Sequence, residues 1–488
     1  MSRIWCVLLL GGCLALSQGA DNPGAVIQID IGTIDHAVST ALTESDVLQK
    51  MAEAATKKKP NTKPIKGISG IKVKDIRPPV ITLTLLPGTG LFMAVLVQMT
   101  IAGKSFIGGN MEIKMAANLT ADNRLSQDAL GTPKFSSENC HISLISVKTN
   151  LPSSMLPKVL NKLLDSTLQK VLPSLLCPAV DVVLNLVNAK LTTMTSEISL
   201  GTAGTLRYAL LNPPTTSETF IQLDLKTILH QKEGDEIDLP TDQPPLTSLP
   251  PKKEAATQLI LSANFLSAEL RIMQASFNLD IRDNMVLGLP PLVTSMLGAL
   301  IPEISRALPP SQPLTIEMRA ARPPLVTVTP EASFVRVFST AKLLASSSGS
   351  APASLFVLDV CSDLKARFVV RGEKLCVSLA LDSLSEMALA SSSVGTFDEL
   401  PLKRILANVI HVAYVPSINA ALQGGIPLPD LLGIKYQQAE ISRSELVLNL
   451  MREELRLLPA TAARNEQKRA KGGATSVGGL QSVVFLFA

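Results

Sequence analysis

The stretch from Ile76 to Thr84, Ile-Arg-Pro-Pro-Val-Ile-Thr-Leu-Thr, has a close copy from Ala321 to Thr329, Ala-Arg-Pro-Pro-Leu-Val-Thr-Val-Thr. In each copy a rigid Arg-Pro-Pro lead-in precedes apolar residues that alternate with threonine, which predicts a half-buried strand. The two arginines are 245 residues apart, and a second pair of similar segments, Leu156–Leu160 and Pro401–Leu406, has the same spacing. Two landmarks in one order and at one spacing indicate duplicated halves, with chance similarity of short Pro and Leu motifs as the alternative.

The length and composition of the chain limit the classes of protein that it can belong to. Its 488 residues allow more than one hydrophobic core, since single cores stop growing at about 250 to 300 residues. It is 46% hydrophobic but only 3% aromatic and 18% charged, so its apolar residues are mostly aliphatic and suit smooth cavities as well as cores. The net charge of +4 and the lack of a base-stacking motif do not indicate nucleic acid as a partner.

Residues 1–20 form a predicted secretory signal peptide. Arg3 precedes the apolar run Ile4–Leu16, and the small residues Gly19 and Ala20 suit cleavage. The alternative, an N-terminal membrane anchor, would need a longer apolar run. We therefore expect a protein that is secreted or retained in the lumen of the endoplasmic reticulum.

Removal of the signal peptide leaves four cysteines: Cys140, Cys177, Cys361 and Cys376. An oxidising compartment favours disulfides, and four cysteines allow three connectivities. Pairing of nearest neighbours would join Cys140 on a predicted strand to Cys177 on a long predicted helix. Cys361 and Cys376 lie on predicted hairpin strands that turn at residues 371–373, which puts Cys376 opposite Phe368, so only a bulge would bring these two thiols together.

Strand and helix patterns follow a similar plan in the two halves. A strand at Ala25–Ile31 leads into an amphipathic helix, and short strands with turns then run to about Ile145, which predicts an antiparallel sheet. A long helix with one apolar face is predicted at Leu156–Leu191, kinked at Pro173 and Pro178. Further strands are expected at 206–211, 220–225, 259–265 and 276–281, a helix at 291–308, hairpin strands at 355–370 and 374–381, and a helix at 402–422 kinked at Pro416.

The Pro-rich stretch 239–253 is typical of a stiff, extended linker and marks the domain boundary. The predicted organisation is a signal peptide at 1–20, an N-terminal barrel at 21–238, the linker at 239–253, a C-terminal barrel at 254–451, and a basic, Gly-rich tail at 452–488 that we expect to be disordered.

One stretch of the chain is strongly basic and contains Lys57, Lys58, Lys59, Lys63 and Lys66. A solvated loop that keeps the protein soluble is one interpretation of this cluster. Contact with an anionic lipid or another polyanion is the other.

No catalytic or metal-binding motif occurs in the sequence. Its histidines are scattered without metal-ligand spacing, and it has no Gly-x-Ser-x-Gly elbow, His-Glu-x-x-His motif or dinucleotide fingerprint. We therefore predict no enzyme, no metal and no cofactor. The sequon Asn118-Leu119-Thr120 predicts N-glycosylation, provided that Asn118 does not point inward.

The signal peptide, the duplicated halves, the Pro-rich linker and Cys140 with Cys177 resemble the BPI/LBP/PLUNC lipid-binding superfamily. Lys63–Ile68, Gly103–Ile113 and Val147–Pro152 are most similar to BPI-fold-containing family B, its long PLUNC branch, and Gly425–Pro429 matches the sequence after the last long helix of the family. The resemblance implies an α+β, two-domain BPI fold, or tandem super-roll. Each half would be a strongly twisted antiparallel sheet wrapped against long amphipathic helices, with a central sheet and the linker joining the halves. It also implies a disulfide between Cys140 and Cys177.

The resemblance further implies an apolar, phospholipid-sized pocket against the helices of each half. The expected lining of the N-terminal pocket is Ile34, Val38, Leu160, Leu164, Leu168 and Leu172. The expected lining of the C-terminal pocket is Phe334, Phe338, Ile405, Val409 and Leu422.

The expected partner is a phospholipid or another acyl-chain lipid, with the lysine cluster on the headgroups of anionic host phospholipids at a membrane surface. The alternatives are a lipopolysaccharide-binding protein of innate defence and an unrecognised lipid esterase. Host lipid is favoured over lipopolysaccharide because the chain is only mildly basic and the cluster offers lysine rather than the forked arginine that grips phosphate.

Overall fold

The computed structural model describes residues 22–44, 68–77, 79–105, 110–150, 158–232, 234–241, 246, 249–252, 256–346, 352–430, 432–436, 439–442 and 446–451. The lysine cluster and the predicted tail lie outside these residues, as does the predicted signal peptide. The described chain forms three antiparallel sheets with a few helices, which is the α+β class predicted from the sequence.

The first sheet lies in the N-terminal half and has five strands. They are β2 (Ile68–Ile76), β3 (Val80–Leu86), β4 (Gly90–Ser105), β5 (Asn110–Gln127) and β6 (Pro133–Thr149). The order is β2-β4-β5-β6, and β3 also pairs with β4. The edge of the sheet is therefore interrupted at the Arg-Pro-Pro motif, where β2 ends and β3 begins. This follows from chemistry, since proline has no backbone N–H to donate to a neighbouring strand.

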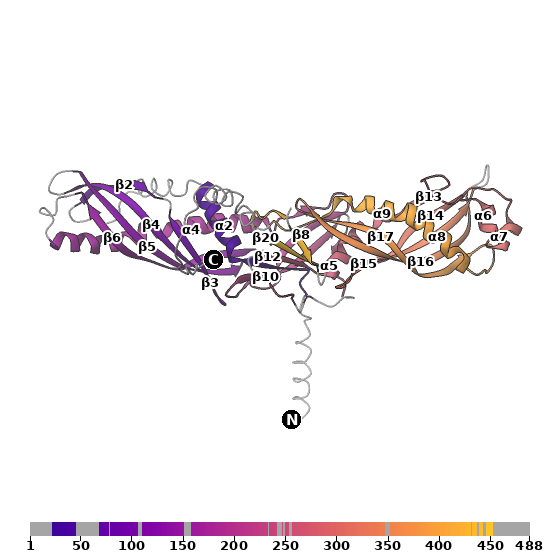
Figure 1. Ribbon diagram of the computed structural model, residues 1–488, viewed down its shortest axis with the longest axis horizontal. Coiled ribbons are helices and arrows are strands. Elements are labelled where there is room, and N and C mark those ends of the chain that lie inside the picture. The colour runs from indigo at the N-terminus through magenta and orange to yellow at the C-terminus, as the bar shows by residue number, and fades with distance from the viewer. Residues whose placement is uncertain are drawn as a thin grey trace, which may run out of the picture. The chain divides into compact units, whose positions relative to one another are not determined.

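The helix α4 (Lys158–Thr193) lies along this sheet (Figure 1). It confirms the long helix expected at Leu156–Leu191 and contains both predicted prolines, Pro173 and Pro178. A disulfide between Cys140 on β6 and Cys177 on α4, with Cα atoms 6.0 Å apart, ties the helix to the sheet as the family resemblance implied.

The second sheet has nine strands and is built from both halves of the sequence. They are β1 (Ala25–Asp30), β7 (Ile198–Ser199), β8 (Gly204–Leu210), β9 (Thr215–Thr216), β10 (Phe220–Gln231), β11 (Glu236–Ile237), β12 (Ala256–Leu261), β19 (Glu440–Ser442) and β20 (Leu446–Met451). The order is β19-β20-β12-β1-β10-β8-β7, with β9 and β11 also on β10. Because β1 lies between β10 and β12, strands from before and after the Pro-rich stretch share one sheet.

The described part of the Pro-rich stretch packs on this central sheet. Leu246 and Leu249 lie against a small apolar cluster that includes Val26 and Ile260. Lys252 Nζ donates to Asp30 Oδ1 over 3.0 Å at a site where both side chains are largely buried. These contacts hold the stretch against the sheet, while the domain boundaries drawn at 239 and 253 stay predictions.

The third sheet lies in the C-terminal half and has six strands in sequence order. They are β13 (Leu279–Arg282), β14 (Leu314–Val328), β15 (Ser333–Ala345), β16 (Ala353–Arg371), β17 (Lys374–Ser392) and β18 (Ile426–Pro427). The second Arg-Pro-Pro motif lies inside β14, where the pairing with β15 shifts between Ala320 and Arg322 and again between Arg322 and Leu325. Here the prolines produce irregular pairing rather than the end of a strand.

The strand predicted at 259–265 is wrong in its second half. The strand β12 ends at Leu261, and the helix α5 (Ala263–Met273) follows directly. Ser262 caps the helix because its Oγ accepts a hydrogen bond from the backbone N–H of Phe265 over 3.0 Å. The helical spacing of Leu266, Leu270 and Met273 carried this signal, but the short apolar run suits a buried strand equally well.

The single helix predicted at 291–308 is also wrong, because two short helices occur there. The helix α6 (Thr294–Gly298) ends before Ile301, which is extended, and α7 (Pro302–Ala307) begins at Pro302. The residue before a proline is sterically disfavoured in the helical region, so the chain breaks at Ile301.

The last helical run covers the predicted 402–422 but is not uniform. It consists of the 3₁₀ turns η3 (Leu400–Leu402) and η5 (Leu422–Gly424), the helices α8 (Lys403–Val409) and α9 (Val415–Ala421), and one π-helical turn at Ile410–Tyr414. The π turn precedes Pro416, whose ring would clash with the carbonyl one turn earlier in a regular helix. The run is long and apolar enough to cross a membrane by length and composition, but a core helix passes the same test, and this run packs on β17.

The hairpin of β16 and β17 differs from the prediction by one residue. Arg371 pairs with Lys374 across a tight turn in which Gly372 has a φ of 61°, so Cys376 lies opposite Val369 rather than Phe368. Cys361 is buried opposite Glu386, and neither Cys361 nor Cys376 is in a disulfide.

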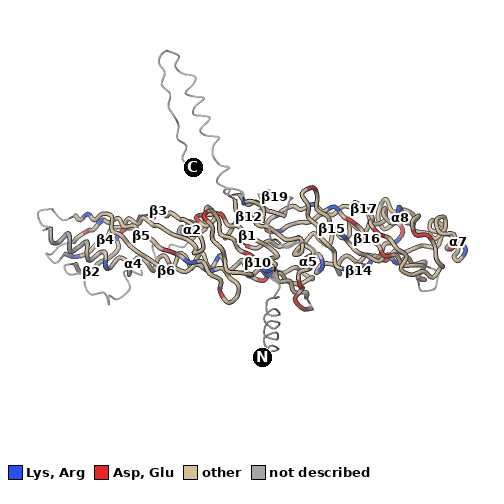
Figure 2. Tube along the Cα trace, turned by 90° about the horizontal axis from the view of Figure 1, so that it is seen from below, with Lys and Arg blue, Asp and Glu red and all other residues tan. Residues whose placement is uncertain are grey.

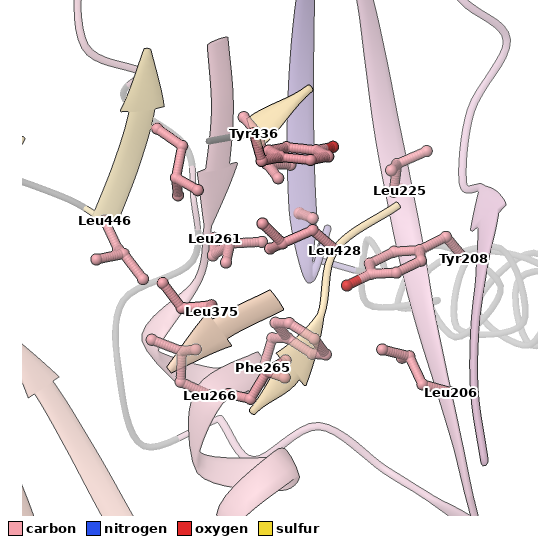
Figure 3. Packing of buried hydrophobic residues seen from close by; sticks show 14 of the residues in the cluster. Leu206, Tyr208, Leu225, Leu261, Phe265, Leu266, Leu375, Leu428, Tyr436 and Leu446 are labelled. Atoms are coloured by element: carbon pink, nitrogen blue, oxygen red, sulfur yellow. The ribbon is translucent and has the colours of Figure 1, made fainter. Parts of the chain in front are cut away.

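One buried tyrosine joins the central sheet to the segment that follows the last helical run, and a second one closes a turn within that segment (Figure 3). Tyr208 on β8 donates a hydrogen bond to the Pro427 carbonyl over 2.9 Å, and Tyr436 donates to the Pro429 carbonyl over 2.6 Å. Figure 3 shows Leu428 between Tyr208 and Leu261. Packing of this kind fixes residues more than 200 positions apart in sequence.

Candidate functional site

An apolar slot lies between the N-terminal sheet and α4. Its lining comes from the break between β2 and β3, from β3, β4 and β5, and from the middle of α4. The lining residues are Ile76, Pro79, Ile81, Met93, Val95, Val97, Leu119, Leu176, Ala179, Val180 and Val183. Every one of these side chains is apolar, so the slot offers no hydrogen bond to a ligand.

The local sequence explains why these side chains meet. Met93, Val95 and Val97 are every second residue of β4 and therefore share one face of the sheet. On α4 the lining residues fall at spacings of three and four, which places them on one side of the helix. Ala179 is the smallest residue in the lining, and its short side chain keeps the helix from filling the slot.

A second apolar slot lies in the C-terminal half, between the third sheet and the helices α6 and α8. The lining residues are Leu292, Met296, Leu297, Leu314, Ile316, Leu343, Leu358, Leu402, Ile405 and Leu406. This lining is also wholly apolar. Leucine predominates here, whereas valine and isoleucine are more frequent in the N-terminal slot.

Both slots are narrow in this structure. The N-terminal slot has about 540 Å³ of space between atoms, its open mouth included, of which the centre of a water molecule can reach about 50 Å³. The corresponding volumes for the C-terminal slot are about 340 and 20 Å³. Sites for small molecules usually enclose about 300 to 1,000 Å³, far more than the 50 and 20 Å³ that the centre of a water molecule can reach in these two slots. A long acyl chain would therefore need the helices to move away from the sheets.

None of the residues predicted to line the N-terminal pocket belongs to the lining of this slot. Ile34 and Val38 on α2 (Ile31–Glu44) and Leu168 and Leu172 on α4 are buried in the core instead. Leu160 and Leu164 also lie on α4, but their side chains are outside the described residues. The slot contacts α4 at Leu176 and beyond, further along the same helix.

The structure brings one of the residues predicted for the C-terminal pocket to the slot, namely Ile405. Val409 and Leu422 are buried in the core, and Phe334 and Phe338 on β15 are half-buried. The ring of Phe338 lies 4.0 Å from the guanidinium carbon of Arg322 and so serves a cation–π contact.

The strand residues of both slots were missed in the sequence. The alternation of Met93, Val95 and Val97 beside the Arg-Pro-Pro break was a usable signal, because a strand break opposite such a strand leaves space against the helix.

Asn118 lies on β5 next to Leu119, which lines the slot, and successive strand residues face opposite sides. Asn118 thus faces away from the slot, and its glycosylation stays a prediction.

No charged residue is among the lining residues of either slot. Figure 2 shows basic and acidic positions interspersed along the described chain. Several of them form exposed ion pairs, such as Arg124 with Glu138 and Arg336 with Asp363. The lysine cluster predicted to contact headgroups lies outside the described residues.

Glu269 on α5 is the one acidic residue in the described part of the chain whose pKa is strongly shifted. It is fully buried, and neither of its carboxylate oxygens has a hydrogen-bond partner there. Burial raises its pKa to about 8, so the group is mainly protonated at pH 7. It does not line either slot, and no group of acidic, histidine and cysteine side chains suited to a metal occurs in the described part of the chain.

The three sheets and the two slots define a two-domain protein that encloses apolar space between sheet and helix in each half. Residues 32–188 match the N-terminal domain of the LBP / BPI / CETP family, and residues 199–451 match its C-terminal domain. The chain belongs to this family of lipid-binding proteins, and its fold is the BPI fold.

Two relatives and one solved structure place the chain within the family. It is 44% identical over 452 residues to human BPI fold-containing family B member 6, a match that covers 92% of this chain and 99% of the relative. It is 35% identical to human BPI fold-containing family B member 4 over 79% of this chain and 64% of that protein. The crystal structure of lipopolysaccharide binding protein aligns with a TM-score of 0.55 and 19% identity over 88% of this chain and 98% of that one, which supports the shared fold.

Proposed function

We propose that the protein is a non-catalytic lipid-binding protein of the secretory pathway, which holds acyl chains in its two apolar slots. The observation that carries this proposal is the lining of the slots, in which every residue is apolar. The predicted signal peptide and the Cys140–Cys177 disulfide support secretion. Retention in the endoplasmic reticulum gains no support from the relatives, so secretion is the proposed destination.

The energetics favour retention of a lipid once it has entered. Burial of a methylene group contributes about 0.8 kcal/mol, so a long acyl chain contributes on the order of 10 kcal/mol before ordering costs. Part of this free energy has to separate α4 from β4 and β5. No polar side chain lines this slot, but the Cys140–Cys177 disulfide beside Leu176 keeps α4 tied to β6, so the helix would have to move away from β4 and β5 while it stays attached to β6.

The headgroup remains outside an apolar slot and has to be recognised at the surface. We propose that Lys57, Lys58, Lys59, Lys63 and Lys66 bind the headgroups of anionic host phospholipids. Each lysine near an anionic surface contributes about 1 kcal/mol, and salt screens this attraction. The second candidate is lipopolysaccharide, which is favoured by the shared fold with lipopolysaccharide binding protein.

Native mass spectrometry combined with lipid extraction tests the proposal. The purified protein should carry phospholipid or fatty acid, and Ala179→Phe, which fills the N-terminal slot, should lower the amount per protein. Val182→Phe is a matched control, because Val182 lies on the same helix but is exposed. A protein without bound lipid that also fails to take up a fluorescent phospholipid would refute lipid binding.

Vesicle binding at matched ionic strength separates the two headgroups. Replacement of Lys57, Lys58 and Lys59 by glutamine should weaken binding to phosphatidylserine vesicles, more at low salt than at high salt, and leave the bound lipid unchanged. Tighter binding to lipopolysaccharide than to phosphatidylserine would favour lipopolysaccharide over host phospholipid as the ligand.

The esterase alternative requires turnover of an ester substrate that an active-site inhibitor abolishes.

A further inference from the structure

A loop at the start of the C-terminal half presents large apolar side chains to solvent. It runs from Asp283 to Leu292, between β13 and α6. Leu287 is 103% exposed, the highest value for a large apolar side chain in the described part of the chain, and Met285 is 47% exposed. Isolated exposed leucines are common, but two side chains on one loop, one of them fully exposed, form a protruding apolar tip.

The loop is held in this conformation by its own contacts. The Asp283 carboxylate accepts a hydrogen bond from the backbone N–H of Leu292 over 3.0 Å and so closes the loop at its base. Val286 and Leu289 are half-buried and pack on the core. The apolar side chains of Met285 and Leu287 are exposed. The inward packing of Val286 and Leu289 therefore fixes which apolar side chains of the loop point outward.

The loop that carries the exposed tip leads along the chain into the lining of the C-terminal slot. Leu292, where the loop ends, is part of the slot lining. Leu400 is also exposed, at 66%, and it lies two residues before Leu402, which lines the same slot. Exposed apolar side chains thus precede the slot lining on both chain segments that lead into it.

The size of the tip argues against a protein partner. A stable protein interface buries roughly 800 Å² on each partner, which a few side chains on a protruding loop do not supply. A fluid apolar phase needs no complementary shape, so it can accept Met285 and Leu287 alone. The charged residues that flank the loop and Leu402 in the sequence are balanced, since Arg282, Lys403 and Arg404 are offset by Asp283, Asp398 and Glu399. The tip therefore has no built-in preference for an anionic surface.

We propose that Met285 and Leu287 insert into the apolar interior of a phospholipid surface and place the C-terminal slot against it. The inference rests on the proposed function, because an acyl chain enters a slot most directly from the phase in which lipids reside. It differs from headgroup binding by the lysine cluster, since insertion does not depend on anionic lipid and is barely weakened by salt.

Tryptophan fluorescence tests insertion directly. The one tryptophan of the chain, Trp5, lies in the predicted signal peptide, so the secreted Leu287→Trp protein carries a single indole. With phosphatidylcholine vesicles at high salt, its emission should shift to the blue, and bromine atoms on the acyl chains should quench it. Leu130→Trp is the matched control, because Leu130 is 73% exposed on a turn of the N-terminal half and should show neither effect.

A second measurement uses the double change Met285→Ser and Leu287→Ser. Full burial of a leucine is equivalent to roughly a ten- to hundredfold factor in partitioning, so the double variant should bind phosphatidylcholine vesicles at least tenfold more weakly. Leu130→Ser should bind like the wild type. Because the changes lie outside the slot lining, the double variant should keep its bound lipid.

The outcomes separate the two proposals. An unquenched indole in a Leu287→Trp protein that carries lipid would overturn insertion and leave lipid binding intact. Equal vesicle binding by the double variant, with an unchanged circular dichroism spectrum, would overturn insertion as well. A wild-type protein without lipid in either slot would instead remove the proposed function.

Discussion

The two copies of the Arg-Pro-Pro motif are alike in sequence but have different surroundings. In each half a strand of the central sheet runs directly into a helix, β1 into α2 and β12 into α5, and the motif follows further along the chain. In the N-terminal half the motif interrupts the sheet edge, and an apolar slot lies there, lined by Ile76, Pro79 and Ile81. In the C-terminal half α5 packs on β14, the strand that contains the second motif.

Specific contacts hold α5 on the second copy. The backbone N–H of Val326 donates to Ser267 Oγ over 2.8 Å, and Gln274 Nε2 donates to the Arg322 carbonyl over 3.0 Å. The helix thereby satisfies backbone groups of β14 beyond Met318, where β13 no longer pairs with this strand. The comparison teaches that a proline pair opens a sheet edge, while the neighbouring helix decides whether the opening becomes a slot or a packed core.

The largest expected effect concerns the disulfide, which only the N-terminal half has among the described cysteines. Replacement of Cys140 and Cys177 by alanine should lower the free energy of unfolding by about 2 to 5 kcal/mol, because the bond closes a loop of 37 residues. Hydrogen exchange should show a loss of amide protection mainly in α4 and β6. Cys376→Ala is the control, and equal protection of α4 in both variants would contradict the prediction.

The second prediction concerns Glu269, since α5 carries a fully buried acid. The folded state keeps its proton up to about pH 8, whereas the unfolded chain loses it above about 4.5, so the wild type loses stability between these pH values. Glu269→Gln should therefore be more stable by roughly 3 kcal/mol at pH 7 and match the wild type at pH 4. Denaturant titrations at several pH values measure this, and a pH-independent difference would argue against a buried, protonated acid.

The third prediction tests the hold of α5 on the second motif. Ser267→Ala removes the acceptor for the Val326 N–H in a buried position and should cost about 1 to 3 kcal/mol. Chemical denaturation measures the loss. Ser295→Ala, at an exposed position of α6, is the control for a serine lost from a helix, and an equal loss in both would show that the contact to β14 contributes little.

The smallest effect compares the two arginines of the motif. The guanidinium of Arg322 stacks on Phe338, whereas the guanidinium of Arg77 donates to Gln98 Oε1 at an exposed position over 3.2 Å. Arg322→Ala should cost about 0.5 to 1 kcal/mol and Arg77→Ala less than about 0.5 kcal/mol. Thermal unfolding of both variants measures the difference, and the reverse order would mean that the motif is fixed more firmly in the N-terminal half.

Much of the fold could be predicted from local pattern. The antiparallel character of the first sheet, the length of α4 and the family resemblance follow from alternation, helical spacing and short motifs. The expectation of short strands there was wrong, because β4, β5 and β6 have 16, 18 and 17 residues. The position of the N-terminal slot could not. Periodicity identifies the apolar face of α4 but not which part of that face is covered, and so Leu168 and Leu172 were indistinguishable from Leu176 and Val180. That choice depends on where β2 ends and how β4 lies across the helix, which are tertiary contacts.

The shared strand β1 also has a consequence for the order in which the protein folds. Ala25 pairs with Leu225 and with Leu261, which are 200 and 236 residues further along the chain. At ribosomal rates of about 5 to 20 residues per second, β1 waits roughly 10 to 50 seconds for these neighbours. During this interval an apolar strand, Ala-Val-Ile-Gln-Ile-Asp, has no partner strands, so it is open to pairing with other chains. A fragment that stops at residue 238 would leave one edge of β1 permanently unpaired.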